Sequence, residues 1–284
     1  MDTGNYIGFN NGVYDVLNDR FLPNGSVPLN GMCTNYDYVG PDDPKFPEMR
    51  LLASKRRSTS STVGCTPTTT RTPTTSVSPR CGWCPEVSCS PGTRARRGAK
   101  LPFVLLGSYG DSGISTFTEL IQLTLGDYAV TADRTSLSGA RGHTALDPRL
   151  VANHNALVCV FPDVQGTSRF TFNSAKLKAL TGNDVHGVHG KHRSVTHVTI
   201  SFKPIFHFSY MDPRPQLDSD DPAARNRLWV AEPDVQRRRF PSPPAIENLR
   251  DRMKQWAPFH FLLMLEALRD FRRRNYVLPV GACL

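Results

Sequence analysis

The stretch LPFVLLGSYGDSGISTFTELIQLTLGDYA, residues 101–129, decides how the chain is interpreted. Residues 101–107 form a short continuous apolar run that ends in glycine, which is typical of a buried parallel strand. A glycine-rich turn follows, and after it apolar residues recur at helical spacing until Gly126 marks a helix stop. These apolar residues are Phe117, Leu120, Ile121 and Leu125. The stretch therefore predicts a strand, a tight turn and a helix.

The turn has the composition of a phosphate-binding loop. In such a loop, backbone N–H groups at a helix N-terminus cradle phosphates, a lysine neutralises the transferring group, and a Ser or Thr hydroxyl holds magnesium. Here Ser108 stands where the motif expects its first glycine, and Ile114 stands where it needs lysine. The candidate nucleotide-binding residues are Gly107, Ser108, Gly110, Asp111, Ser112, Gly113, Ile114, Ser115 and Thr116.

Length and composition are those of a globular protein. The 284 residues can bury one sizeable core, or one core with a small appended module. No apolar run reaches the roughly 18 to 20 residues that a bilayer span needs. The N-terminus lacks a basic region followed by an apolar one, so no secretory signal is expected. We expect an intracellular protein with no membrane partner.

The positive charge is concentrated in one segment. Residues 51–100 hold nine Lys or Arg residues against the single acid Glu86, which accounts for +8 of the net charge of +9. Within this segment, residues 58–79 carry 14 Ser or Thr in 22 positions. Such a tract buries too little apolar surface to offset its ordering entropy, so it predicts a disordered linker.

Cysteines follow this tract in the sequence CGWCPEVSC, residues 81–89. Cys81 and Cys84 form a C-x-x-C pair that Cys65 or Cys89 could extend into a zinc site. No second such pair and no His pair lies at a supporting distance. Reduced thiols in a linker are the simpler interpretation, and we do not expect zinc.

The remaining segments extend the pattern of strands and helices. Residues 1–50 read as a small β-rich module with a turn at Asn10-Asn11-Gly12. Further strands are expected at 156–161, 195–202 and 205–210, and a short helix at 174–180. Residues 246–274 are strongly helical, with a break or fresh start expected at Pro258. Strands that alternate with helices predict a parallel α/β sheet.

Several of these pieces together resemble a known family. LLGSYGDSGISTFTELIQLTLGDYA resembles the phosphate-loop region of viral superfamily 3 helicases, of the poxvirus-type primase–helicase family found in large DNA viruses and phages. ALVCVFPDVQG resembles that family's second-motif strand, KLKALTGNDV its K-x-L-T-G-x-D segment, and FKPIFHFSYMDPRP its third-motif strand. DPAARNRLWVAEPDVQRRRF is similar to its arginine-bearing stretch. IGFNNGVYDVLNDRFLP and WAPFHFLLMLEALRDF are similar to its pre-helicase module and its C-terminal helices.

The resemblance implies a domain organisation and a fold. It implies a small N-terminal module at 1–50, a linker at 51–100 where the family has a helical collar segment, a helicase core at 101–243 and C-terminal helices at 244–284. The implied core is a phosphate-loop NTPase-like parallel sheet of the AAA+ kind.

The resemblance also implies ligands and partners. ATP with magnesium would occupy the loop, and DNA would meet a hairpin after the Thr-Gly-x-Asp segment, where Lys191 and Arg193 could contact phosphates. Subunits would form a hexamer, in which Arg227, with Arg225 beside it, would match the arginine finger that reaches a neighbour's nucleotide.

The chain departs from the family at its polar positions. The lysine is replaced by Ile114. The second-motif glutamate falls at Phe161 or Pro162, with Asp163 a displaced candidate acid. The third-motif asparagine falls at Tyr210, and the arginine after the Thr-Gly-x-Asp segment at His189. Losing both the lysine and the acid predicts loss of ATP hydrolysis, while the backbone cradle for phosphate persists.

Three hypotheses follow. The leading one is a superfamily 3 helicase-like protein of a DNA virus that is deficient in ATP hydrolysis and structural or vestigial, for example as a hexamer subunit beside an active paralogue. The second is an active helicase in which Asp111 or Asp163 holds magnesium and Lys176 or Lys178 replaces the missing lysine. The third is a nucleic-acid-binding adaptor that acts through the basic linker.

Overall fold

The computed structural model describes residues 6–26, 31–47, 103–107, 113–139, 146–162, 170–182, 184–188, 196–209, 216–225, 227–231 and 246–275. By its contacts the chain divides into two compact units. The first contains Met1–Val39, Gly98–Phe261 and Cys283–Leu284, and the second contains Gly40–Arg97 and Leu262–Ala282. The features discussed below belong to the first unit unless stated otherwise.

The strands are β1 (Tyr6–Phe9), β2 (Gly12–Asp15), β3 (Arg20–Pro23), β4 (Phe103–Gly107), β5 (Ala129–Thr131), β6 (Val158–Phe161), β7 (Thr171–Phe172), β8 (Val185–Val188), β9 (Thr196–Thr199), β10 (Lys203–Ser209), β11 (Gln216–Leu217) and β12 (Trp229–Ala231). The helices are α2 (Ile114–Leu125), α3 (Pro148–Ala152), α4 (Ser174–Thr181), α5 (Pro222–Arg225) and α6 (Leu249–Arg273), with 3₁₀ turns η2 (Gly126–Tyr128) and η3 (Arg134–Leu137). None of these described helices combines the length and apolar character that a bilayer crossing requires.

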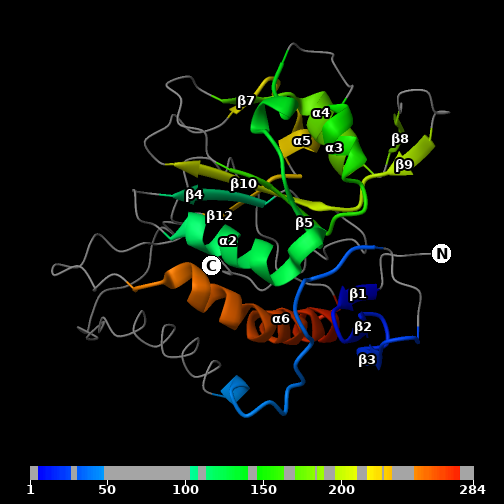
Figure 1. The fold of residues 1–284 in the computed structure, drawn as a ribbon. Helices are drawn as coiled ribbons and strands as arrows, with labels where there is room; N and C mark the ends of the chain where they lie inside the picture. The colour runs from blue at the N-terminus through cyan, green and yellow to red at the C-terminus, as the bar shows by residue number, and fades with distance from the viewer. Residues whose placement is uncertain are drawn as a thin grey trace, which may run out of the picture. The chain divides into compact units, whose positions relative to one another are not determined.

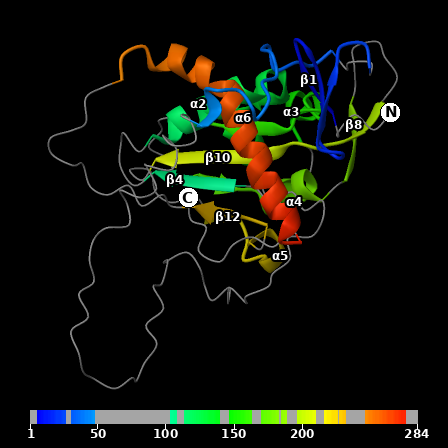
Figure 2. The same ribbon diagram turned by 90° about the horizontal axis from the view of Figure 1, so that it is seen from below.

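The central sheet has five strands in the order β12-β4-β10-β6-β5, and every neighbouring pair is parallel. Figure 2 shows β12, β4 and β10 side by side. Strand β4 precedes the other four in the chain but lies inside the sheet, between β10 and β12. Its carboxyl end at Gly107 is paired with Ser209 of β10. The predicted parallel α/β class is therefore confirmed.

Helices cover both faces of this sheet. Helix α2 lies along one face, while α3 and α4 lie on the other (Figure 1). Because both faces are covered, the strands are apolar on successive residues rather than alternating. In β6, for example, Cys159, Val160 and Phe161 are all buried.

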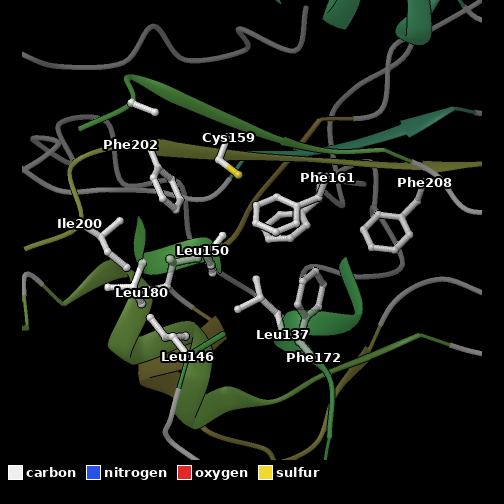
Figure 3. Packing of buried hydrophobic residues seen from close by; sticks show 13 residues of the cluster. Leu137, Leu146, Leu150, Cys159, Phe161, Phe172, Leu180, Ile200, Phe202 and Phe208 are labelled. Atoms are coloured by element: carbon white, nitrogen blue, oxygen red, sulfur yellow. The ribbon is translucent and has the colours of Figure 1, made fainter. Parts of the chain in front are cut away.

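A hydrophobic core lies on the face that carries α3 and α4. Phe161 of β6 and Phe206 of β10 stack with ring centroids 4.5 Å apart, and Phe172 meets Phe206 edge to face at 5.0 Å. Leu150 and Leu180 close the cluster from the helices (Figure 3). Burying each of these side chains contributes about 1.5 to 3 kcal/mol, so this cluster fixes the positions of β6 and β10.

The N-terminal strands form an antiparallel meander, β1-β2-β3. Phe9 is opposite Gly12, so Asn10 and Asn11 form the predicted two-residue turn. The meander is attached to the end of α2, because the Tyr128 hydroxyl accepts a hydrogen bond from the Gly8 N–H at 2.9 Å and donates to the Met32 carbonyl at 3.1 Å.

The strand expected at 195–202 is present over residues 196–199 as β9, which pairs with β8 in an antiparallel hairpin apart from the central sheet. One expectation from the sequence was wrong. The break expected at Pro258 is absent, and α6 runs without interruption past it. Proline removes one helical hydrogen bond, but Ala257, Phe259 and Phe261 are buried on either side of it. Their packing keeps the helix continuous although this hydrogen bond is missing.

Candidate functional site

The predicted strand-to-helix crossover is present. Strand β4 ends at Gly107, and α2 begins at Ile114 after Gly113, which is the N-cap residue with φ 76° and ψ 3°. This left-handed conformation favours glycine over any residue with a side chain. Of the nine candidate nucleotide-binding residues, Ser108, Gly110, Asp111 and Ser112 lie outside the described residues.

The first turn of α2 presents backbone donors. The Phe117 N–H makes the first helical bond, to the Gly113 carbonyl at 2.9 Å, so the N–H groups of Ile114, Ser115 and Thr116 precede it. This turn, all of it described, receives no side-chain cap and carries no acidic residue. A helix N-terminus with this pattern carries partial positive charge that suits a phosphate.

Ile114 does not supply the charge that a working loop needs. Its side chain is only 4% exposed and packs in the protein interior. A lysine at this position would place an ammonium group over the bound phosphates, whereas the isoleucine contributes apolar packing alone. The described part of the loop therefore fits an anion through its backbone and lacks the motif's cation.

The second-motif strand ends in an aromatic residue instead of an acid. Phe161 is fully buried against Phe206 on the face of the sheet that carries α3 and α4. Asp163 and Tyr210 lie outside the described residues. Among the described residues, no group of three or more His, Cys, Asp or Glu side chains could hold a metal ion. The magnesium roles considered for Asp111 and Asp163 therefore stay predictions.

The two lysines considered as replacements are engaged elsewhere. The Lys176 ammonium donates to the Ser136 and Ser138 carbonyls at 3.0 and 2.8 Å, and that of Lys178 donates to Asp221 at 2.7 Å. Both belong to α4, on the opposite face of the sheet from α2. The structure gives no support to a substitute lysine at these positions.

Arg227 and Arg225 make different contacts. Arg227 Nη1 donates to the Lys178 carbonyl and to Thr181 Oγ1, both at 2.8 Å. Arg225 pairs with the exposed Asp220. The finger role of Arg227 stays a prediction, and it would require the guanidinium to leave both acceptors.

Two paired strands flank the predicted DNA-facing residues in the sequence. Strands β8 and β9 pair antiparallel, with Val188 opposite Thr196. Lys191 and Arg193 come between these paired residues in the sequence, but they lie outside the described residues. The zinc candidates Cys81, Cys84 and Cys89 also lie outside the described residues. The DNA contacts of Lys191 and Arg193 stay a prediction.

One buried cation was not identified from the sequence. Arg134 follows β5 and is only 7% exposed, with its guanidinium carbon 5.4 Å from the ring centre of Phe170 and 5.3 Å from that of Phe208. Phe208 is paired with Leu106, next to the carboxyl end of β4. A single arginine in a polar stretch gives no periodic signal, so only the fold places this charge near the carboxyl edge of the sheet.

The chain is similar to a viral protein whose name describes it as a helicase. No family model matches it. A protein of Acanthamoeba polyphaga mimivirus named "Putative helicase" is 24% identical over 297 residues, covering 98% of this chain. The chain spans only 28% of that protein's length.

Two solved structures show distant similarity. The apo structure of the NrS-1 C-terminal region has a TM-score of 0.37 and 13% identity, over 56% of this chain and 34% of that one. A JCV helicase with a bound small molecule has a TM-score of 0.31 and 15% identity, over 59% of this chain and 45% of that one.

Proposed function

We propose that this chain is a superfamily 3 helicase-like core from a DNA virus, related to replicative primase–helicases, that is deficient in ATP hydrolysis. It acts inside the host cell as a structural subunit that binds DNA and assembles in a ring, on its own or with an active helicase. The buried Ile114 at the start of α2 carries this proposal. The similarity to a mimivirus protein named as a helicase supports the family part.

The size of the rate factors that charged groups contribute favours complete loss of ATP hydrolysis over a partial reduction. Phosphoryl transfer depends on positioning and on stabilising negative charge, and one charged contributor is worth a factor of about 10³ or more. Ile114 removes the phosphate-facing lysine, and Phe161 stands at one of the two positions that the resemblance gives for the metal-holding acid. Two such losses together would leave no useful turnover. The first-turn N–H groups of α2 would still suit a phosphate.

Binding to DNA would use the β8–β9 hairpin. Lys191 and Arg193 lie between its two strands in the sequence, where the resembled family meets DNA. Contacts of this kind neutralise phosphates and release counterions, so binding would weaken steeply as salt rises.

The test is ATP turnover by the purified chain, with and without single-stranded DNA, followed by DNA binding. We expect no turnover above a blank in either condition, together with salt-sensitive binding of a labelled oligothymidylate. Turnover stimulated by DNA would overturn the claimed deficiency and restore the active helicase. DNA binding that survives Lys191→Ala with Arg193→Ala, but is lost when residues 51–100 are deleted, would favour the adaptor.

A further inference from the structure

Helix α4 is held at its N-terminal end by the segment that precedes Arg227. The Asn173 side chain accepts from the Lys176 N–H at 3.0 Å, and Asp218 accepts from the Ser174 N–H at 3.0 Å. One turn later, the Lys178–Asp221 ion pair at 2.7 Å joins the helix to the same segment. Residues 216–221 therefore fix the first half of α4.

Arg227 completes this arrangement at the other end of the helix. Its Nη1 donates to the Lys178 carbonyl, in the last turn of α4, and to Thr181 Oγ1. The Thr181 hydroxyl donates its own proton to the Leu177 carbonyl at 2.7 Å. Its oxygen is therefore oriented as an acceptor for the guanidinium. Hydrogen bonds from a charged donor are about twice as strong as neutral ones.

Gly182 leaves room for this contact. A Cβ added at Gly182 would lie 2.8 Å from the Lys178 carbonyl oxygen, the same atom that Arg227 binds, and 3.1 Å from an oxygen of Asp184. Any side chain there would displace the carbonyl or the turn. The Thr-Gly-x-Asp segment therefore leaves the space that the guanidinium occupies.

The contact joins two distant parts of the fold. Arg227 lies two residues before β12, whose Trp229 is paired with Phe103 of β4. On the other side, β8 begins at Val185, three residues after Gly182. The guanidinium therefore connects the edge strand beside β4 to the base of the β8–β9 hairpin.

We propose that Arg227 is a positioning residue that acts within its own chain: it clamps the C-terminal end of α4 and so orients the β8–β9 hairpin for DNA. The DNA part of this inference rests on the proposed function. The clamp itself rests only on the contacts of Arg227, Thr181 and Gly182. It assigns Arg227 a role in cis, in place of the intersubunit finger implied by the family resemblance.

The clamp is tested by a thermodynamic cycle with Arg227→Ala, Thr181→Val and the double variant, each unfolded in urea. We expect each single variant to raise the unfolding equilibrium constant by about tenfold or more, because a charge-assisted bond is lost. The double variant should raise it by clearly less than the product of the two. The matched control is Arg225→Ala, which removes the same charge two residues away from a solvent-exposed pair and should change little.

The hairpin role is tested by binding of labelled oligothymidylate at a temperature where every variant is fully folded. Arg227→Ala should weaken binding several-fold without changing the salt dependence, because Arg227 touches no phosphate; a direct phosphate contact would lower the slope by about one. Arg225→Ala should bind as the wild type does. If Arg227→Ala fails to fold, the variant Gly182→Ala takes its place in both measurements. Its added methyl group displaces the Lys178 carbonyl and so removes the same contact.

The outcomes separate the two ideas. Multiplicative effects of Arg227→Ala and Thr181→Val, or a stable Arg227→Ala variant, would overturn the clamp. A reduced salt slope would make Arg227 a DNA ligand and overturn the positioning role. If the wild-type chain binds no DNA, the DNA part of the proposed function and the hairpin role both fail, while the urea cycle still decides the clamp.

Discussion

His260 Nδ1 lies 2.8 Å from Thr124 Oγ1, where the first half of α6 meets the last turn of α2. The Thr124 hydroxyl donates to the Leu120 carbonyl at 2.7 Å, so the proton shared with His260 belongs to the imidazole Nδ1. The Thr124 carbonyl in turn accepts from the Tyr36 hydroxyl at 2.6 Å. Thr124 therefore connects α2, α6 and the N-terminal module.

The first prediction concerns the pH dependence of stability. Burial lowers the pKa of His260 from 6.5 to about 4. The imidazole is therefore neutral in the folded chain near pH 5, whereas the unfolded chain binds a proton there. Stability due to this group is complete above pH 6.5 and is lost as the pH falls toward 4, by about 3 kcal/mol at most. Urea unfolding at a series of pH values measures this loss.

A matched variant identifies the group responsible. His260→Gln cannot titrate, so its stability should fall less between pH 7 and 5 than that of the wild type. Equal slopes for the two proteins would show that His260 is not the group that titrates.

The second prediction concerns attachment of the N-terminal module. Tyr128→Phe removes the hydroxyl that accepts from the Gly8 N–H and donates to Met32. Leaving these groups unpaired costs about 1 to 3 kcal/mol. Hydrogen exchange should therefore accelerate at the Gly8 amide. Tyr14→Phe is the control, since its hydroxyl binds Asp19 inside the module; acceleration at Gly8 in both variants would contradict the attachment.

The sequence was sufficient to predict the main elements that are buried in the core. The apolar run at 101–107 and the helical spacing after it predicted β4 and α2, and the run at 156–161 predicted β6. It did not reveal β5 or β12, because each has three residues and lies at an edge of the sheet. Periodicity needs a longer segment to be recognised.

The site was only partly predictable for a related reason. Local composition indicated the crossover and the missing lysine at Ile114, since both depend on neighbouring residues. The partners of Arg227 and Arg134 are brought together by tertiary packing, with Arg227 meeting Thr181 from 46 positions away. No spacing rule encodes such a contact, so the sequence did not indicate that Arg227 binds the C-terminal end of α4.

The third prediction concerns the aromatic core that fixes β10. Phe206 is fully buried and contacts both Phe161 and Phe172. Phe206→Ala should lower the free energy of unfolding by about 3 to 5 kcal/mol, because it removes apolar contact and leaves a cavity. Phe117→Ala, from a side chain that is 36% exposed on α2, should have a clearly smaller effect. Equal losses in urea unfolding would contradict this account of the core.

The fourth prediction returns to the phosphate loop. Ile114→Lys restores the cation at the start of α2, and Ile121→Lys places the same charge on a buried position of the same helix, about two turns further along. Both variants bury part of a lysine and should be less stable than the wild type. Only Ile114→Lys puts an ammonium group where it can face bound phosphates.

Affinity for a fluorescent ATP analogue should therefore rise several-fold in Ile114→Lys and stay unchanged in Ile121→Lys. Turnover should remain at the blank in both, because a lysine at 114 supplies charge for binding but no acid to hold magnesium or to orient water. Hydrolysis appearing in Ile114→Lys alone would show that an acid such as Asp163 is already in place. The lysine would then be the single missing part of the site, and the loss of the second-motif acid inferred from Phe161 would be wrong.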